Sequence, residues 1–159
     1  MWGAAGWKHL VVLAWPAFAL AAPELAAFGA DRLLRPPSYL ATVTGDGGVR
    51  VHPVTPILSA TGLYVFMEPT SPKGRDLRER RRFAMHNGVP DTEGSGGEFF
   101  LSGEGRAVDD DAVRAGVVAA ASYQPAERYV LFELLVGAAR ANGYGDVTLP
   151  EPRRWSAGP

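Results

Sequence analysis

The chain has 159 residues, a net charge of -1 from 16 basic and 17 acidic side chains, and no cysteine. This length favours one domain with a substantial core, and the near-neutral charge favours neither a nucleic-acid nor a membrane-surface partner. The lack of cysteine excludes a disulfide framework, a thiolate metal site and a cysteine nucleophile. Three histidines, at positions 9, 52 and 86, are too few and too scattered for a histidine-based metal site. We therefore expect a cytoplasmic protein without a metal centre.

The N-terminal segment is apolar over residues 10–22 and follows Lys8, a pattern that resembles a secretory signal. Pro16 interrupts this run, which is also shorter than the ~20 residues of a membrane span. Pro23 and Glu24 then indicate the start of a helix. We divide the chain into an N-terminal extension, residues 1–22, and one domain, residues 23–159. A cleaved signal remains the alternative for the extension.

From residue 38 onward the sequence predicts short strands joined by tight turns. Residues 38–44, 49–58 and 63–67 are rich in β-branched and aromatic residues and are separated by the turn sequences GDGG and ATG, which predicts a meander. Residues 82–89, 98–108 and 129–136 give three further strands. Short helices are predicted over residues 74–81 and after three aspartates at 109–111. Six antiparallel strands with a few short helices predict a mostly β (α+β) fold, as a closed or split six-stranded barrel.

Two prolines interrupt the second predicted strand. Pro53 and Pro56 each remove a backbone donor from the ladder, so the strand should bend there. The bend is compatible with a barrel corner, with a ligand groove, or with both. Arg50 and His52 lie two residues apart on this strand, so their side chains should leave the same face. An arginine beside such a groove suits bidentate recognition of a phosphate or carbonyl group.

A second cluster of polar residues follows the third strand. The loop sequence TSPKGRD places Ser71, Lys73 and Arg75 at the start of a helical charge pattern. The first amide groups of a helix lack intrahelical partners and attract anions. A phosphate could therefore accept charge-assisted hydrogen bonds in this loop. No nucleophile–base pair, Walker loop or dinucleotide fingerprint accompanies it, so the catalytic residues stay unassigned and the difficult chemistry would belong to a bound cofactor.

The ordered set of segments resembles the pyridoxamine 5'-phosphate oxidase-like, FMN-binding split-barrel family. The segments that carry the resemblance are YLATV at 39–43, RVHPVTP at 50–56, LYVF at 63–66, SPKGRDL at 71–77 and EFFLSG at 98–103. The resemblance implies a six-stranded split barrel that forms a homodimer with two FMN sites at the subunit interface. It also implies a flavin-linked oxidoreductase acting on a small-molecule substrate, with no nucleic-acid or membrane partner.

Transferred residue by residue, the resemblance assigns a lining role to the second strand and a phosphate-binding role to the loop. The cofactor-binding residues that it implies are Arg50, Val51, His52, Pro53, Val54, Ser71, Lys73 and Arg75. Relatives of this kind also bind a deazaflavin coenzyme, so a deazaflavin-dependent reductase is an alternative. A flavin-binding or sensor protein without turnover is the third. An arginine and histidine set for a substrate phosphate is missing near the C-terminus, which argues against vitamin B6 oxidation.

Overall fold

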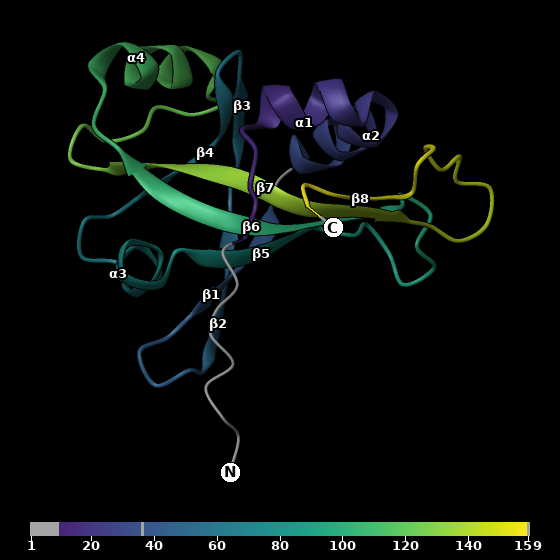
Figure 1. The fold of residues 1–159 in the computed structure, drawn as a ribbon, viewed down its shortest axis with the longest axis horizontal. Helices are drawn as coiled ribbons and strands as arrows, with labels where there is room; N and C mark the ends of the chain where they lie inside the picture. Colours follow the sequence, from purple (N-terminus) through teal and green to yellow (C-terminus); the bar gives the residue numbers. More distant parts are fainter. Residues whose placement is uncertain (1–9, 36, 159) are drawn as a thin grey trace.

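The computed structural model describes residues 10–35 and 37–158. Within these ranges the chain forms four short helices and one antiparallel sheet (Figure 1). The helices are α1 (Trp15–Ala21), α2 (Pro23–Leu33), α3 (Pro72–Arg80) and α4 (Asp111–Ala120). The strands are β1 (Ser38–Val43), β2 (Val49–Val54), β3 (Ile57–Ser59), β4 (Gly62–Met67), β5 (Arg82–Asn87), β6 (Glu98–Val108), β7 (Val130–Asn142) and β8 (Arg154–Ser156).

The sheet curls so that its two ends are joined by a very short piece of chain. Its strands follow the order β2-β1-β5-β6-β7-β4-β3, with β8 paired to β7. β2 and β3 lie at opposite ends of this path, yet only Thr55 and Pro56 separate them in the sequence. The sheet must therefore wrap around the core, which makes it a half-barrel. This confirms the mostly β split-barrel architecture.

The predicted meander is wrong in one respect, and the strand count of six changes with it. The predicted strand at 49–58 is broken at Thr55 and Pro56, and its two pieces pair with different neighbours: β2 with β1, and β3 with β4. Pro56 cannot donate a ladder hydrogen bond, which favours a break at this place. With β3 separated and β8 added near the C-terminus, the described residues contain eight strands.

β7 is the long central strand and extends well beyond the predicted end at residue 136. It pairs with β6 over nearly its whole length, and a register shift between Ser102 and Gly103 accommodates its curvature. A Cβ at Gly103 would lie 1.8 Å from the carbonyl oxygen of Leu135. Only glycine permits this close approach of the two backbones. β7 can therefore continue through a bend near residue 136, where the hydropathy pattern predicted that the strand ends.

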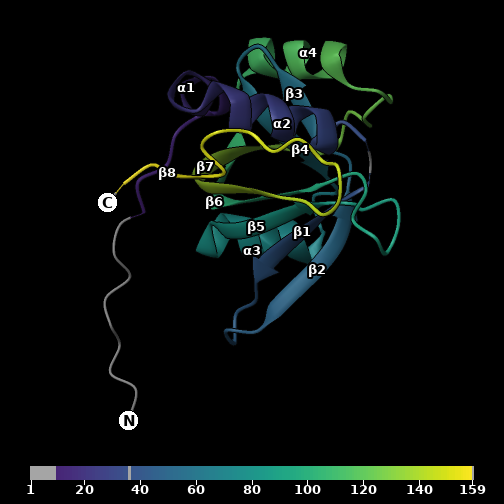
Figure 2. The same ribbon diagram turned by 90° about the vertical axis from the view of Figure 1, so that its right-hand side faces the viewer.

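The core fills the inside of the curl. Phe99, Leu101 and Phe132 are fully buried there. Leu25 of α2 and Leu77 of α3 both belong to this core. In two perpendicular views α1 and α2 lie together near β7, whereas α3 lies apart from them, near β1 and β5 (Figures 1 and 2). α2 begins at Pro23, as predicted. None of the helices in the described part of the chain is long and apolar enough to cross a membrane.

The described part of the predicted N-terminal extension packs against this core. Trp15 and Phe18 of α1 are buried, and the Phe18 ring lies 4.8 Å from the ring of Trp155, which belongs to β8. Leu13 forms an isolated bridge with Val136 of β7. Residues 1–9 of the extension lie outside the described residues. The domain boundary after residue 22 stays a prediction. α1, which lies on the N-terminal side of that boundary, packs into the core.

Candidate cofactor site

Lys73 and the bent end of β2 line one cavity of about 300 Å³. Lys73 comes from the first turn of α3, whereas Pro53 and Val54 come from the end of β2. Seven residues line the cavity: Pro37, Pro53, Val54, Thr55, Phe66, Lys73 and Tyr123. Three of them were expected from the sequence to contact a cofactor. The two polar segments identified in the sequence therefore converge within a single chain.

The turn that carries Lys73 has a clear local cause. The Ser71 hydroxyl caps α3 by accepting a hydrogen bond from the Gly74 amide at 3.1 Å, and Pro72 occupies the first helical position. Ser71 is buried and its hydroxyl holds the first turn of the helix, while its contact with a cofactor stays a prediction. Lys73 is half-buried, and within the described residues its ammonium group makes no hydrogen bond or ion pair. The cation is thus free to meet an anion in the cavity.

Arg50 is tied to the same helix by a buried carboxylate. Its Nε donates to Oδ2 of Asp76 at 3.1 Å, and the hydroxyl of Thr42 donates to the same oxygen at 2.8 Å. Asp76 belongs to α3, and Thr42 lies directly opposite Arg50 in the β1–β2 pair. α3 and β2 run in opposite directions here, because Asp76 meets Arg50 whereas Lys73 meets Val54. The Arg50–Asp76 contact therefore joins β2 to the helix that carries Lys73, although neither residue lines the Lys73 cavity.

The remaining expected residues occupy different surfaces. Exposure alternates along β2, so His52 shares the half-buried face with Arg50, as predicted, whereas Val51 points to the opposite face and is 61% exposed. Arg75 is exposed on α3 and does not line the Lys73 cavity. The structure therefore brings Pro53, Val54 and Lys73 to one cavity, which Arg50, Val51, His52 and Arg75 do not line.

Sequence reasoning missed several contributors to this site. Asp76 was assigned no role from the sequence, and it pairs with Arg50 from β2. Phe66 and Tyr123 supply aromatic walls from β4 and from the loop after α4. Burial raises the pKa of the Tyr123 phenol above its usual value of 10.0, with a smaller contribution from Tyr129. The phenol is therefore an uncharged hydrogen-bond donor near neutral pH.

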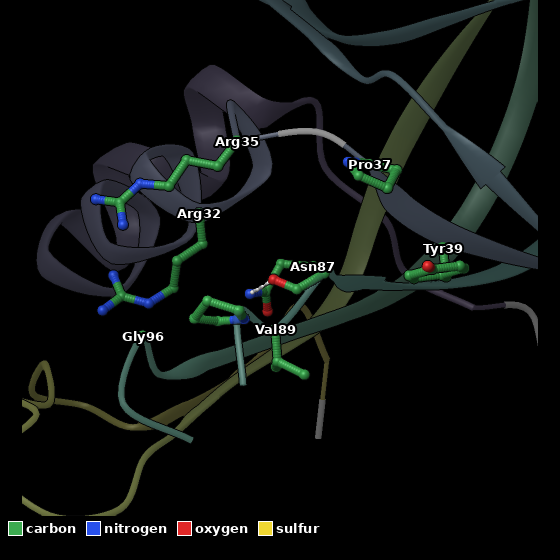
Figure 3. Close-up of a pocket in the computed structure, with 9 residues that line it drawn as sticks. Arg32, Arg35, Pro37, Tyr39, Asn87, Val89 and Gly96 are labelled. Atoms are coloured by element: carbon green, nitrogen blue, oxygen red, sulfur yellow. Dashed lines mark hydrogen bonds between the residues drawn. The ribbon is translucent and has the colours of Figure 1, made fainter. Parts of the chain in front are cut away.

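A second cavity of about 390 Å³ shares Pro37 with the first (Figure 3). Tyr39 lies on one side of it, and Arg32 and Arg35 extend from the C-terminal end of α2 on the other (Figure 3). Both guanidinium groups already have partners: Arg35 binds Asp31 at 2.7 Å, and Arg32 stacks on the ring of Phe28. Burial lowers the pKa of Arg32 from its usual value. These arginines thus secure the end of α2 and border the cavity.

No family model matches the sequence, and no curated protein matches it. Similar solved structures exist. A heme binding protein from Mycobacterium smegmatis has a TM-score of 0.64 at 21% identity, over 84% of this chain and 57% of that chain. The chain thus spans less than two thirds of that protein's length.

Two further structures resemble the chain over nearly their whole length. A candidate pyridoxamine 5'-phosphate oxidase from Listeria innocua has a TM-score of 0.61 at 14% identity, over 74% of this chain and 96% of that chain. The heme storage protein HutZ from Vibrio cholerae has a TM-score of 0.56 at 16% identity, over 84% and 92%. The chain has the split-barrel fold of the pyridoxamine 5'-phosphate oxidase-like proteins. At these identities the likeness establishes the fold and leaves the activity open.

Proposed function

We propose that the protein binds FMN and acts as an oxidoreductase on a small organic substrate. The observation that carries this proposal is the cavity in which the unpaired Lys73 ammonium meets the bent end of β2. A free lysine in the first turn of a capped helix suits the terminal phosphate of a flavin nucleotide, because the charge and the helix amides both favour an anion there. Bound FMN would supply the hydride transfer, while the protein positions it and excludes water.

The size of the cavity supports a specific placement of the cofactor. About 300 Å³ is at the lower end of the range for ligand pockets. We therefore assign the phosphate end of the cofactor to the Lys73 cavity and the ring to the neighbouring surface of β1 and β2. Arg50 and His52, on the half-buried face of β2, flank this path. Tyr123 closes the cavity on its far side with a protonated phenol.

A homodimer belongs to this proposal, because an apolar sheet face lies exposed beside the cavity. On the outward face of the β1–β2 pair, Val49 lies opposite Val43, Val51 opposite Ala41, and Pro53 opposite Tyr39. Val49, Val51 and Tyr39 are 76%, 61% and 45% exposed. A contiguous apolar face of this kind is typical of an interface. A second copy on this face would bury Val49, Val51 and Tyr39 between the two subunits.

Three other cofactor functions compete with this one. A deazaflavin coenzyme also carries an anionic tail that would suit Lys73, which would make the protein a deazaflavin-dependent reductase. A flavin carrier or sensor without turnover is supported by the absence of an evident acid–base pair around the cavity. Heme is the cofactor named for two of the structural neighbours.

The visible spectrum of the purified protein separates these options. We expect a yellow protein with the two absorption bands of an oxidised flavin, from which FMN is released on denaturation. A single band at shorter wavelength would indicate a deazaflavin, and an intense Soret band would indicate heme. A protein that retains no chromophore and does not bind added FMN would contradict the proposal. Rapid-mixing reduction by nicotinamide donors then distinguishes an enzyme from a passive carrier.

A further inference from the structure

Asp76 is a buried carboxylate that the proposed chemistry does not by itself require. It is 5% exposed, lies in the middle of α3, and accepts hydrogen bonds from Thr42 and from Arg50 on the same oxygen, Oδ2. Burying a carboxylate costs several kcal/mol unless it is paired. Arg50 and Thr42 provide the pairing, and both come from the β1–β2 hairpin. The contact therefore joins the hairpin to the helix that carries Lys73.

The geometry of this contact leaves most of the Arg50 guanidinium available. Only Nε of Arg50 donates a hydrogen bond to Asp76, and within the described residues Nη1 and Nη2 donate none. The side chain is 34% exposed. A guanidinium carries its five N–H groups in one rigid plane, so fixing Nε also fixes the direction of the two terminal nitrogens. Asp76 thus orients the Arg50 fork without occupying it.

The Arg50 guanidinium, held at Asp76, lies about one turn along α3 from Lys73. Lys73 and Asp76 are three residues apart on this helix, so their side chains lie on the same face, one turn apart. The guanidinium held at Asp76 is therefore one helical turn from the base of Lys73. A single phosphate can accept hydrogen bonds from a lysine and from an arginine fork at that spacing.

We propose that Asp76, supported by Thr42, is a positioning residue that holds Arg50 beside Lys73, so that the two cations form one phosphate-binding pair. The identity of the phosphate-bearing ligand as FMN rests on the proposed function, whereas the pairing of Arg50 with Lys73 through Asp76 rests on the contacts above. Removal of Asp76 should therefore impair recognition of the phosphate and spare recognition of the ring.

The test compares the affinity for FMN with the affinity for riboflavin, which has the same ring and no phosphate. Asp76→Asn keeps the size of the side chain and an oxygen that accepts from Thr42, but removes the charge that orients Arg50. We expect Asp76→Asn and Arg50→Gln each to weaken FMN binding about tenfold and to leave riboflavin binding unchanged. The double variant should be no weaker than Arg50→Gln alone, because Asp76 acts through Arg50. Glu79→Gln removes an exposed carboxylate from the same helix and is the matched control.

An unchanged FMN affinity in Asp76→Asn would overturn the inference, and so would three other results of the flavin titrations. They are an additive loss in the double variant, an equal loss of FMN and riboflavin affinity in Asp76→Asn, and tighter FMN binding in Asp76→Asn, which would mean that Asp76 only neutralises Arg50. If the parent protein binds neither flavin, the proposed function fails, and titration with inorganic phosphate decides the inference separately. Phosphate binding that weakens in both single variants supports it, and phosphate binding that is absent or insensitive to them overturns it.

Discussion

The guanidinium of Arg106 grips the carboxylate of Glu133, with Nη2 and Nε at 2.6 and 2.7 Å from the same oxygen. The two residues face each other in the β6–β7 pair, and Glu133 also lies opposite Tyr64 of β4. Glu133 is therefore a buried charge in the middle of the sheet, with its partner at the surface.

Replacing Arg106 should destabilise the fold without affecting the Lys73 cavity. Arg106→Met leaves the Glu133 carboxylate buried without its counter-charge, and we expect the free energy of unfolding to fall by about 1–3 kcal/mol. Urea denaturation measures the loss. Adding Glu133→Gln should recover part of it, because the unpaired charge is then gone. Equal stability of Arg106→Met and the parent protein would show that the pair contributes nothing.

Lys73→Ala should weaken cofactor binding and leave the fold intact. The ammonium has no partner within the described residues, so its loss breaks no internal contact. One charge-assisted hydrogen bond to a phosphate is worth about 1.5–3 kcal/mol, or about 10- to 100-fold in the dissociation constant for FMN. Fluorescence titration of FMN measures the change. Arg128→Gln, which removes an exposed cation paired with Glu68, is the control and should bind FMN normally.

The contribution of α1 to the core can be tested with two neighbouring apolar residues. Phe18 is fully buried, whereas Leu20 is 87% exposed two residues later on the same helix. We expect Phe18→Ala to reduce the free energy of unfolding by about 3–5 kcal/mol and Leu20→Ala to change it by less than about 0.5 kcal/mol. A small effect of Phe18→Ala would indicate that residues before 23 behave as the separate extension predicted from the sequence.

The free energy of unfolding should fall at alkaline pH because the Tyr123 phenol is partly buried. Burial raises the pKa of its phenol in the folded state above the usual value of 10.0. The stability linked to this group is therefore complete below the unfolded pKa and is lost as the pH rises through the folded pKa. Tyr123→Phe should flatten this part of the profile of unfolding free energy against pH. Tyrosinate absorbance should lose a transition above pH 10.0 in the same variant, and an unchanged titration would contradict the assignment.

The proposed homodimer predicts a change in mass when a charge enters the apolar face. Val51→Glu places a carboxylate at an exposed position of the β1–β2 face, where a second copy would bury it. We expect the parent protein to sediment as a dimer and the variant as a monomer with weaker flavin retention. Leu20→Glu adds the same charge on α1, away from this face, and should stay dimeric. A monomeric parent protein would refute the proposed interface.

Much of the architecture could be predicted because local rules agree with the final structure. β6 spans residues 98–108 as predicted, and its alternating burial places Phe99 and Leu101 inside. Asp110 caps α4, as the run of acidic residues indicated. The strand break at Pro56 was only half predicted. The prolines indicated a bend, but which strand each piece pairs with depends on closure of the whole sheet.

For the candidate site too, contacts between predicted segments could be anticipated from the sequence, whereas contacts of single residues far apart in the chain could not. Lys73 could be expected near Pro53 and Val54, because the order of the segments resembles a family in which these two segments bind one cofactor. The role of Asp76 did not emerge, because its partner Arg50 is 26 residues away and nearer arginines were available. Tyr123 lies in a loop with no periodic pattern, and only the folded chain brings it to the cavity.

β2 is an edge strand of the sheet. An outermost strand offers unpaired amides and carbonyls to any other strand, which invites uncontrolled stacking of molecules. Pro53 deprives this border of an amide near the cavity and Pro56 ends the strand shortly afterwards. Molecules of this protein are thereby discouraged from pairing edge to edge at β2.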